Sequence, residues 1–491
     1  MAQQGVKLTI QDGGLGQTTP GAGNTLVVVG TTKDGAANTP TSGTNPKIFT
    51  DDFTTGPGVE AAALISDATG NPVIFIKAAT TTPGVNSNVQ PGATNTSGCV
   101  VTITGTPLDT YYVVVTVVTA GTVGTVGCVI SISLDAGRTI FVTVNLGIAT
   151  SYAVPNTGIT LNFASGTLVK DDTFSFYSTE PKASAASVVS ALASLLTGQE
   201  VYENILIVGD TDSGEATSYD AQATVLFNHR QYTRILTNAR DALWGGVSTE
   251  TEQAWMTAIE TDFQNFVSDR ISVSGGHYDV ISPISQTQFR RPLSWLAAVR
   301  DASVTIATDL GRVADGPLKP MVVATKPRFF AGSSTPFQYH DETARPGLDA
   351  ARFLSAYTNF GFPGFYILNP NCMAGPASDF NWLQHGEVID EGSFIAYMFF
   401  TLELSNAVKV NRTTGRIDPA FANDIDSRCN GKLDDGLGAP GFVTAATCLV
   451  DRTNNILGTS ELLVNIAITP LAYLKAINVT LQLKTQTIQA V

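Results

Sequence analysis

The sequence predicts an α+β protein: a mixed α/β core with an inserted all-β domain and extended arms at both ends. Three observations predict this class. Short apolar runs alternate with helical periodicity over most of the chain. One long stretch, poor in charge and rich in Thr, Val, Gly and Ser, interrupts that alternation. Near both ends, short segments alternate apolar and polar residues, as half-buried strands do.

Changes in these patterns divide the chain into six predicted segments. They are an N-terminal arm and tether (1–23), the first part of the α/β core (24–88), an inserted β-rich outer domain (89–181), the second part of the core (182–370), a C-terminal helical domain (371–475) and a C-terminal strand arm (476–491).

The N-terminal arm begins with an alternating segment in which Val6, Leu8 and Ile10 are separated by polar residues. Residues 12–23 then carry many glycines, which is typical of a flexible tether. A short strand on such a tether cannot bury its own apolar side chains. We therefore expect it to pair with the edge of a sheet elsewhere.

The core begins with two continuous apolar runs, Leu26–Gly30 and Val73–Ile76, which predict buried strands around a helix at 57–68. In the inserted domain, alternating segments are separated by turn residues at intervals of roughly 10–15 residues, which predicts a small all-β fold. Further strands are predicted at 205–209, 243–247 and 278–282. Helices are predicted at 184–196, 216–236, 249–269, 292–310 and 346–360, and a long amphipathic helix or helix pair at 380–404.

The C-terminal segment shows the strongest local pattern. Ile477, Val479, Leu481 and Leu483 alternate strictly with polar residues, which predicts a half-buried strand. Past Glu461 the only charged residues are two lysines, so this tail is attracted to an acidic second copy at short range. Two interpretations remain open: an arm that pairs with another copy, or a terminal strand in the chain's own sheet.

Composition limits the function classes. The chain has 491 residues and a formal net charge of −14. This charge argues against a nucleic-acid binder, because such a protein needs a basic face. Its apolar runs are too short and too broken to span a bilayer, and the first residues do not read as a secretory signal. Apolar residues make up 43% and charged residues 14%, so a large core is expected.

The cysteines and histidines give no sign of a metal or cofactor site. The five cysteines are scattered without the clustering that zinc needs, and the four histidines lie far apart. One interpretation of the cysteines is buried apolar side chains. The other is a disulfide between subunits, for which the candidates are Cys99, Cys128, Cys429 and Cys448.

Catalytic signatures are also weak. Asp210 and Asp212 follow a predicted buried strand, where they could hold Mg²⁺ and supply a nucleophile in a phosphatase, but Asp, Ser and Gly there are equally typical of an exposed turn. Residues 436–441 match GxGxxG without the strand and helix that a dinucleotide site needs. Residues 424–431 resemble a calcium loop but carry Arg428 and Cys429 where an oxygen ligand and glycine are required.

Several segments together resemble the contractile-tail sheath proteins of bacteriophages. Near the start, an apolar strand ending at Gly30 is followed by a Gly-x-x-Asn-x-Pro loop at 35–40, an F-x-x-x-F step at 49–53 and a second strand ending at Lys77. Pro317-Leu318-Lys319-Pro320 is similar to a sheath loop, and Ser378–Trp382 followed by 390–392 is similar to the sheath C-terminal helix region.

The resemblance implies a structural subunit without catalysis or cofactor. Sheath subunits stack as six-membered rings around a tail tube, terminal arms pair with sheets of neighbouring copies, and the array contracts to drive the tube through the cell envelope. The implied partners are further copies of the chain, a tail tube protein, and baseplate and tail terminator proteins. The implied location is the virion tail, assembled in the host cytoplasm. The alternatives are another virion or baseplate protein, such as an adhesin, and the magnesium-dependent phosphatase.

Overall fold

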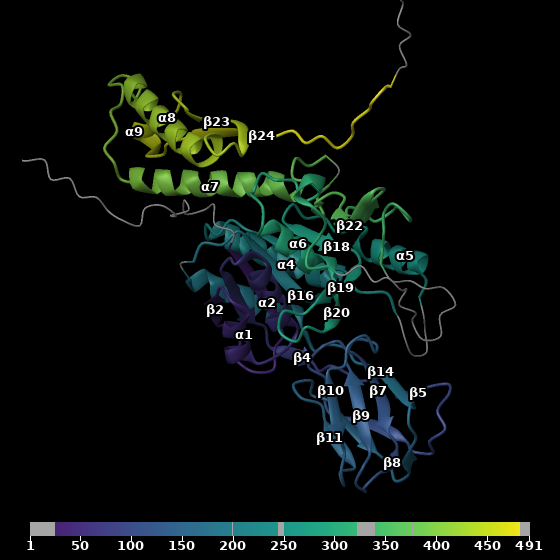
Figure 1. Cartoon of the computed structure of the whole chain (residues 1–491). Coiled ribbons are helices and arrows are strands. Elements are labelled where there is room, and N and C mark those ends of the chain that lie inside the picture. The colour runs from purple at the N-terminus through teal and green to yellow at the C-terminus, as the bar shows by residue number, and fades with distance from the viewer. Residues whose placement is uncertain (1–24, 199, 244–249, 322–338, 376, 482–491) are drawn as a thin grey trace, which may run out of the picture.

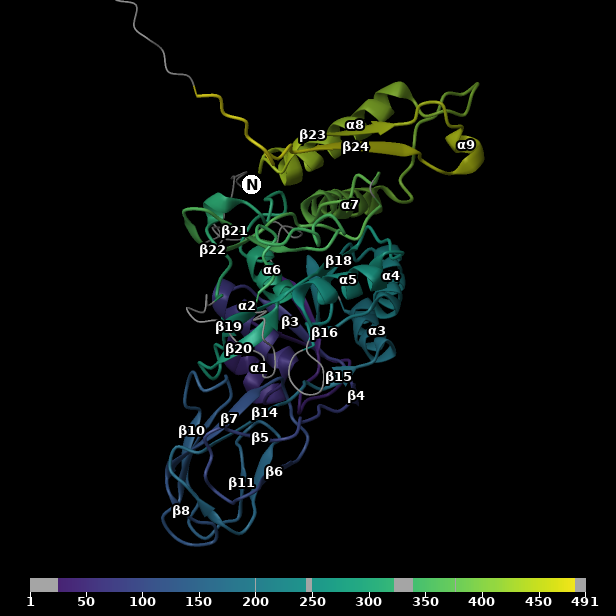
Figure 2. The same ribbon diagram turned by 90° about the vertical axis from the view of Figure 1, so that its right-hand side faces the viewer.

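The computed structural model describes residues 25–198, 200–243, 250–321, 339–375 and 377–481 (Figure 1). The predicted arm residues Val6, Leu8, Ile10 and Leu483 lie outside these ranges, and so does most of the strand predicted at 243–247. Within them the chain combines an α/β core, a β-rich domain at one end and a helix–hairpin unit at the other, which confirms the predicted fold class (Figures 1 and 2).

A six-stranded sheet forms the centre of the core, in the order β18-β17-β16-β1-β3-β2. Five strands run parallel, and only the edge strand β2 is antiparallel to its neighbour. The bounds are Leu26–Gly30 (β1), Pro40–Gly43 (β2), Val73–Lys77 (β3), Asn204–Asp210 (β16), Arg234–Asn238 (β17) and Ile271–Ser274 (β18).

Helices cover both faces of this sheet, which explains the continuous apolar runs Leu26–Val29 of β1 and Val73–Ile76 of β3. Leu26 and Val28 of β1 point to one hydrophobic cluster, whereas Val27 and Val29 point to the other. The first cluster includes α1 (Pro46–Phe53), α2 (Pro57–Thr69) and α6 (Leu293–Asp301). The second includes α3 (Ala185–Ala193), α4 (Ser213–Asn228) and α5 (Glu252–Phe263).

The β-rich domain leaves the core after β3 and returns before α3, and it has a hydrophobic core of its own. Its sheets have the orders β10-β9-β7-β14-β5, β11-β12-β6 and β13-β8, and the pair β4–β15 lies where the chain leaves and re-enters the core. The bounds are 80–82 (β4), 90–91 (β5), 101–104 (β6), 112–119 (β7), 121–122 (β8), 129–133 (β9), 142–145 (β10), 151–153 (β11), 160–163 (β12), 167–168 (β13), 173–177 (β14) and 182–183 (β15).

Two antiparallel hairpins complete the core. They are β19 (His277–Ile281) with β20 (Gln288–Pro292), and β21 (Ala356–Asn359) with β22 (Phe362–Ile367). Phe289 of β20 packs into the core of the β-rich domain. Arg291, two residues later, forms a buried ion pair with Asp109 of that domain. The β19–β20 hairpin therefore fastens the two parts together.

The C-terminal module extends from Leu383 to Pro470. It contains α7 (Leu383–Glu403), α8 (Pro419–Leu433), β23 (Val443–Val450), α9 (Ile456–Thr459) and β24 (Val464–Pro470). Figures 1 and 2 show α7 lying between the core and the hairpin of β23 and β24. No helix in the described ranges has both the length and the apolarity needed to cross a membrane.

Several helix predictions need correction. The helix predicted at 346–360 is wrong: this segment contains turns and β21, and the Asp349 carboxylate accepts hydrogen bonds from the amides of Asn369 and Asn371. The helix predicted at 216–236 ends at Asn228, because Arg230 adopts a left-handed conformation and the chain then enters β17. The helices predicted at 249–269 and 292–310 are shorter than expected.

Candidate assembly interface

The hairpin of β23 and β24 is a two-stranded sheet that pairs with no other strand in the described ranges. One face packs against α7 and α8 through Val443, Cys448 and half-buried Ile466 and Ile468. The opposite face is exposed. Isolated hairpins are marginally stable, and an open sheet edge offers backbone N–H and C=O groups to an added strand.

The outer edge of β23 is already occupied by side chains of α8. Asn430 donates to the carbonyl of Cys448 at 3.2 Å and accepts from its N–H at 2.6 Å. Asp426 accepts from the N–H of Val450 at 2.7 Å. Because alternate residues of an antiparallel pair point these groups away from the partner strand, α8 lies along this edge.

The outer edge of β24 is open in the described structure. Val464, Ile466 and Ile468 lie opposite Val450, Cys448 and Ala446, so their backbone groups point away from β23. None of them is bonded to another described strand. The hairpin therefore presents one edge for strand addition, and that edge is β24.

The chain leaves the module along a short anchored stretch. The Tyr473 hydroxyl donates to the carbonyl of Ala307 at 2.8 Å, and Lys475 pairs with Asp309 while lying over the ring of Trp382. Both contacts fix the tail to the core. The pKa of Tyr473 rises to about 12, mainly through burial.

Beyond Lys475 the side chains of the described tail, residues 476–481, are exposed. Ile477, Val479 and Leu481 are 74%, 73% and 92% exposed, and residues 471–481 form no helix or strand within the chain. The alternating apolar side chains thus have no partner strand in their own described sheets. The predicted pairing of this arm, and of the arm containing Val6, Leu8 and Ile10, with another copy stays a prediction.

The cysteines are buried. Cys99 and Cys128 lie in the β-rich core, and Cys429 and Cys448 lie together between α8 and β23, each at most 5% exposed. Burial raises the pKa of each of these thiols. These environments fit the interpretation as buried apolar side chains. The disulfide between subunits stays a prediction and would require the thiols to leave their cores.

The two aspartates considered for phosphatase chemistry have separate structural contacts. Asp210 accepts from the Asn238 amide at 2.9 Å, and its side chain is 48% exposed. Asp212 caps α4 in a reciprocal capping box with Glu215. No cluster of three potential metal ligands occurs among the described residues. The calcium-like string 424–431 lies within α8, so it forms no ligand loop.

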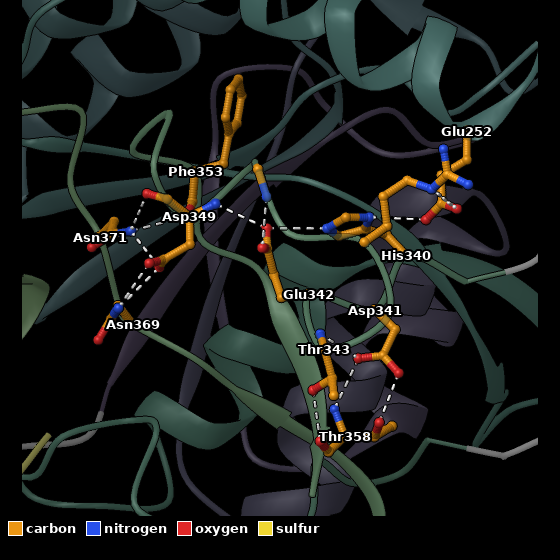
Figure 3. A network of polar contacts seen from close by, with 12 residues as sticks. Glu252, His340, Asp341, Glu342, Thr343, Asp349, Phe353, Thr358, Asn369 and Asn371 are labelled. Atoms are coloured by element: carbon orange, nitrogen blue, oxygen red, sulfur yellow. Dashed lines mark hydrogen bonds and ion pairs between the residues drawn. The ribbon is translucent and has the colours of Figure 1, made fainter. Parts of the chain in front are cut away.

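Sequence reasoning missed one buried polar network, which joins α5 to the segment before β21 (Figure 3). His340 is completely buried and lies 3.1 Å from both the Glu252 and the Glu342 carboxylates. Burial opposes its charge, but the hydrogen bonds to Glu252 and Glu342 raise its pKa overall. The network joins the first turn of α5 to the segment before β21. A lone histidine without a motif gave no signal for it.

Comparisons place this geometry among known folds. The family model described as DUF2586, N-terminal domain, matches residues 3–371. Comparison of the sequence with curated proteins gives no match.

Several solved structures are similar to this chain over nearly its whole length, and three of them follow. A chain of the anti-feeding prophage (AFP) baseplate in contracted state aligns at 10% identity over 99% of this chain and 98% of its own, with a TM-score of 0.52. A chain of the PVC sheath complex in contracted state, from an extracellular contractile injection system, aligns at 8% identity over 100% and 99%, with a TM-score of 0.50. The sheath tail protein from Desulfitobacterium hafniense aligns at 11% identity over 95% and 100%, with a TM-score of 0.47. The first two similarities show a shared fold.

Proposed function

We infer the function from this premise: the chain belongs to the family described as DUF2586, N-terminal domain, and it has the fold of a contractile injection system sheath subunit. We propose that it is the structural subunit of a contractile tail sheath. The observation that carries the proposal is the whole-chain match to the PVC sheath complex, which includes the C-terminal module as well as the core. The open β24 edge supplies the means of assembly.

Strand addition is the proposed linkage between copies. The arm bearing Ile477, Val479, Leu481 and Leu483, or the arm bearing Val6, Leu8 and Ile10, pairs with a neighbouring hairpin along β24. Main-chain hydrogen bonds then supply affinity, and alternate apolar side chains supply register. Because Asn430 and Asp426 occupy the edge of β23, addition there would first require their hydrogen bonds to break.

In the proposed assembly, six-membered rings of this chain stack around a tail tube protein between a baseplate and a tail terminator. The subunits are assembled in the host cytoplasm and act in the virion tail. Contraction repacks the interfaces between rigid subunits, while the arms keep neighbouring copies connected. No cofactor and no catalytic step are needed for this role.

Negative-stain microscopy of the purified full chain tests the proposal. We expect hollow striated cylinders. Deletion of residues 1–16 or of 476–491 should leave a folded monomer, judged by circular dichroism and gel filtration, that forms no cylinders. Cylinders of wild-type length from both deletion variants would refute the arm mechanism, and persistent monomers of the intact chain would refute the sheath role.

A second candidate, a baseplate component, is favoured by the similarity to a chain of the AFP baseplate. An adhesin role for the β-rich domain belongs to the same class. Quantitative mass spectrometry of purified particles separates the candidates. A sheath subunit is expected in many stacked rings and therefore at far higher copy number than a baseplate protein.

A further inference from the structure

The contact between α7 and the core is rich in carboxyl groups. Glu387, Asp390 and Glu391 on the buried half of α7 face the start of β16 and the end of α6. Glu203 lies directly before β16, and Asp301 is the last residue of α6. Figures 1 and 2 show α7 lying against the core, with the β23–β24 hairpin on its other side.

Only one of these five carboxylates is matched by cations. Asp390 lies 3.1 Å from Arg234 and 3.3 Å from Arg270. The other four, here called the carboxyl cluster, form no ion pair with a described lysine or arginine. They are Glu203, Asp301, Glu387 and Glu391.

A single amide group joins two members of the cluster. The Asn204 nitrogen donates to Asp301 at 2.7 Å and to Glu387 at 2.6 Å. Asn204 is fully buried, and its side-chain oxygen has no partner among the described residues. One neutral amide cannot balance several buried negative charges, because an uncompensated buried carboxylate neutralises by binding a proton instead.

The electrostatic environment agrees with this geometry. Burial is the largest cause in every case: it raises the pKa of Asp301 to about 6 and that of Glu391 to about 7. Burial, followed by the charges of other cluster members, raises the pKa values of Glu203 and Glu387 well above their usual range.

The cluster adjoins a cavity of 600 Å³ that gives protons a route to it. Other titratable groups also face this region. They are Glu200, Tyr202, His229, Arg230 and Tyr232 from the core loops, Arg234 from β17, Arg270 before β18, Cys372, Asp390 and Tyr397 from α7, and Tyr473 after β24. The nearby guanidinium groups favour ionised carboxylates, but two of them are already engaged by Asp390.

We propose that the carboxyl cluster makes the docking of α7 on the core proton-dependent: α7 is held while the cluster carries protons and is loosened when it loses them. The docked state binds more protons than the loosened state. Docking is therefore strongest when the pH is below the ordinary carboxyl pKa of about 4. It weakens as the pH rises through the raised pKa values of about 6 for Asp301 and about 7 for Glu391. Because α7 also carries the β23–β24 hairpin, pH changes the coupling between core and hairpin.

Hydrogen exchange of the full chain at pH 6.0 and 8.5, corrected for intrinsic exchange rates, tests this. Protection of residues 383–392 should fall at least about tenfold at the higher pH, since each unit of pKa shift is a tenfold change in the opening equilibrium. In Glu203→Gln/Glu387→Gln, two cluster members are permanently neutral, so the fall should be clearly smaller. Glu461→Gln, an exposed position in the same module, should behave as the wild type.

Asp301→Asn gives an independent variant if the double variant fails to fold. It too should reduce the fall in protection at pH 8.5. Equal wild-type protection at both pH values would overturn the proposal, as would an undiminished fall in both cluster variants. Restoration of wild-type protection at pH 8.5 by millimolar Ca²⁺ or a diamine would also overturn it, in favour of a cation site.

Discussion

The ion pair between Arg291 and Asp109 allows a sharp test of how the β-rich domain is fastened to the core. Both guanidinium Nη atoms donate to the carboxylate, each at 2.7 Å, and the side chains are only 3% and 2% exposed. Arg291 also lies 4.8 Å from the ring centres of Phe289 and Trp295. Asp109→Asn keeps the shape of the residue but leaves the arginine charge buried without its partner.

Removing one partner of a buried ion pair costs about 3–5 kcal/mol. Here pH should decide where in that range the loss falls. Buried Glu60 lies near Arg291, and its pKa is raised to about 7, mainly by burial, with Asp109 adding to the rise. Without Asp109, Glu60 ionises more readily and partly replaces the lost charge. We expect a loss near 5 kcal/mol at pH 5.5 and near 3 kcal/mol at pH 8.5.

Urea unfolding followed by circular dichroism measures both losses. Asp171→Asn, an exposed substitution in the same domain, is the matched control and should change stability by less than about 0.5 kcal/mol. A loss below about 1 kcal/mol at pH 5.5 would refute the reasoning. A larger loss at pH 8.5 than at pH 5.5 would refute the compensating role of Glu60.

Three further perturbations test other contacts. A Cβ at Gly386 would lie 1.6 Å from the Arg234 guanidinium carbon, so Gly386→Ala should lower the free energy of unfolding by about 1–3 kcal/mol. Gly431→Ala, with open space around it, should raise that free energy by about 0.5–1 kcal/mol. Urea unfolding curves of both variants measure these changes. Because the pKa of His340 is raised on folding, its ion pairs should stabilise the wild type below about pH 6.5 and lose this effect as the pH rises. Thermal unfolding of His340→Gln at the same pH values should lack this pH dependence. Finally, the five buried thiols should react with an aromatic disulfide reagent only after unfolding, and rapid reaction in the native state would contradict their burial.

Sequence patterns predicted the central strands well because the packing there is simple. Both faces of β1 and β3 are covered by helices, so every side chain must be apolar, and a continuous apolar run is the direct result. The same reasoning failed at 346–360, where spacing resembled a helix. The hairpin of β21 with β22 and the bonds of the Asp349 carboxylate to the amides of Asn369 and Asn371 determine that segment, and the Asp349 bonds span 20 and 22 positions of chain.

The polar contacts were beyond sequence reasoning for a similar reason. Asp390 meets Arg234 across 156 positions of chain, and Asn204 meets Glu387 across 183. Only the fold brings these residues together. By contrast, the capping role of Asp212 had a local signal that sequence reasoning did not use: Asp followed three residues later by Glu is a capping pattern.

In the proposed linkage, the sequence predicts the arm but not the sheet edge that would accept it. The alternation of Ile477, Val479 and Leu481 is visible in the sequence, because a strand that buries one face carries an apolar side chain at every second residue. The choice of acceptor edge is not visible, since it depends on Asn430 and Asp426 reaching Cys448 and Val450 from a separate helix. On β23 the outward groups of Cys448 and the N–H of Val450 are already bonded to α8, whereas β24 pairs with no described strand other than β23. In the proposed assembly, the hydrogen bonds of α8 to β23 therefore favour β24 as the edge to which an arm of a neighbouring copy would add.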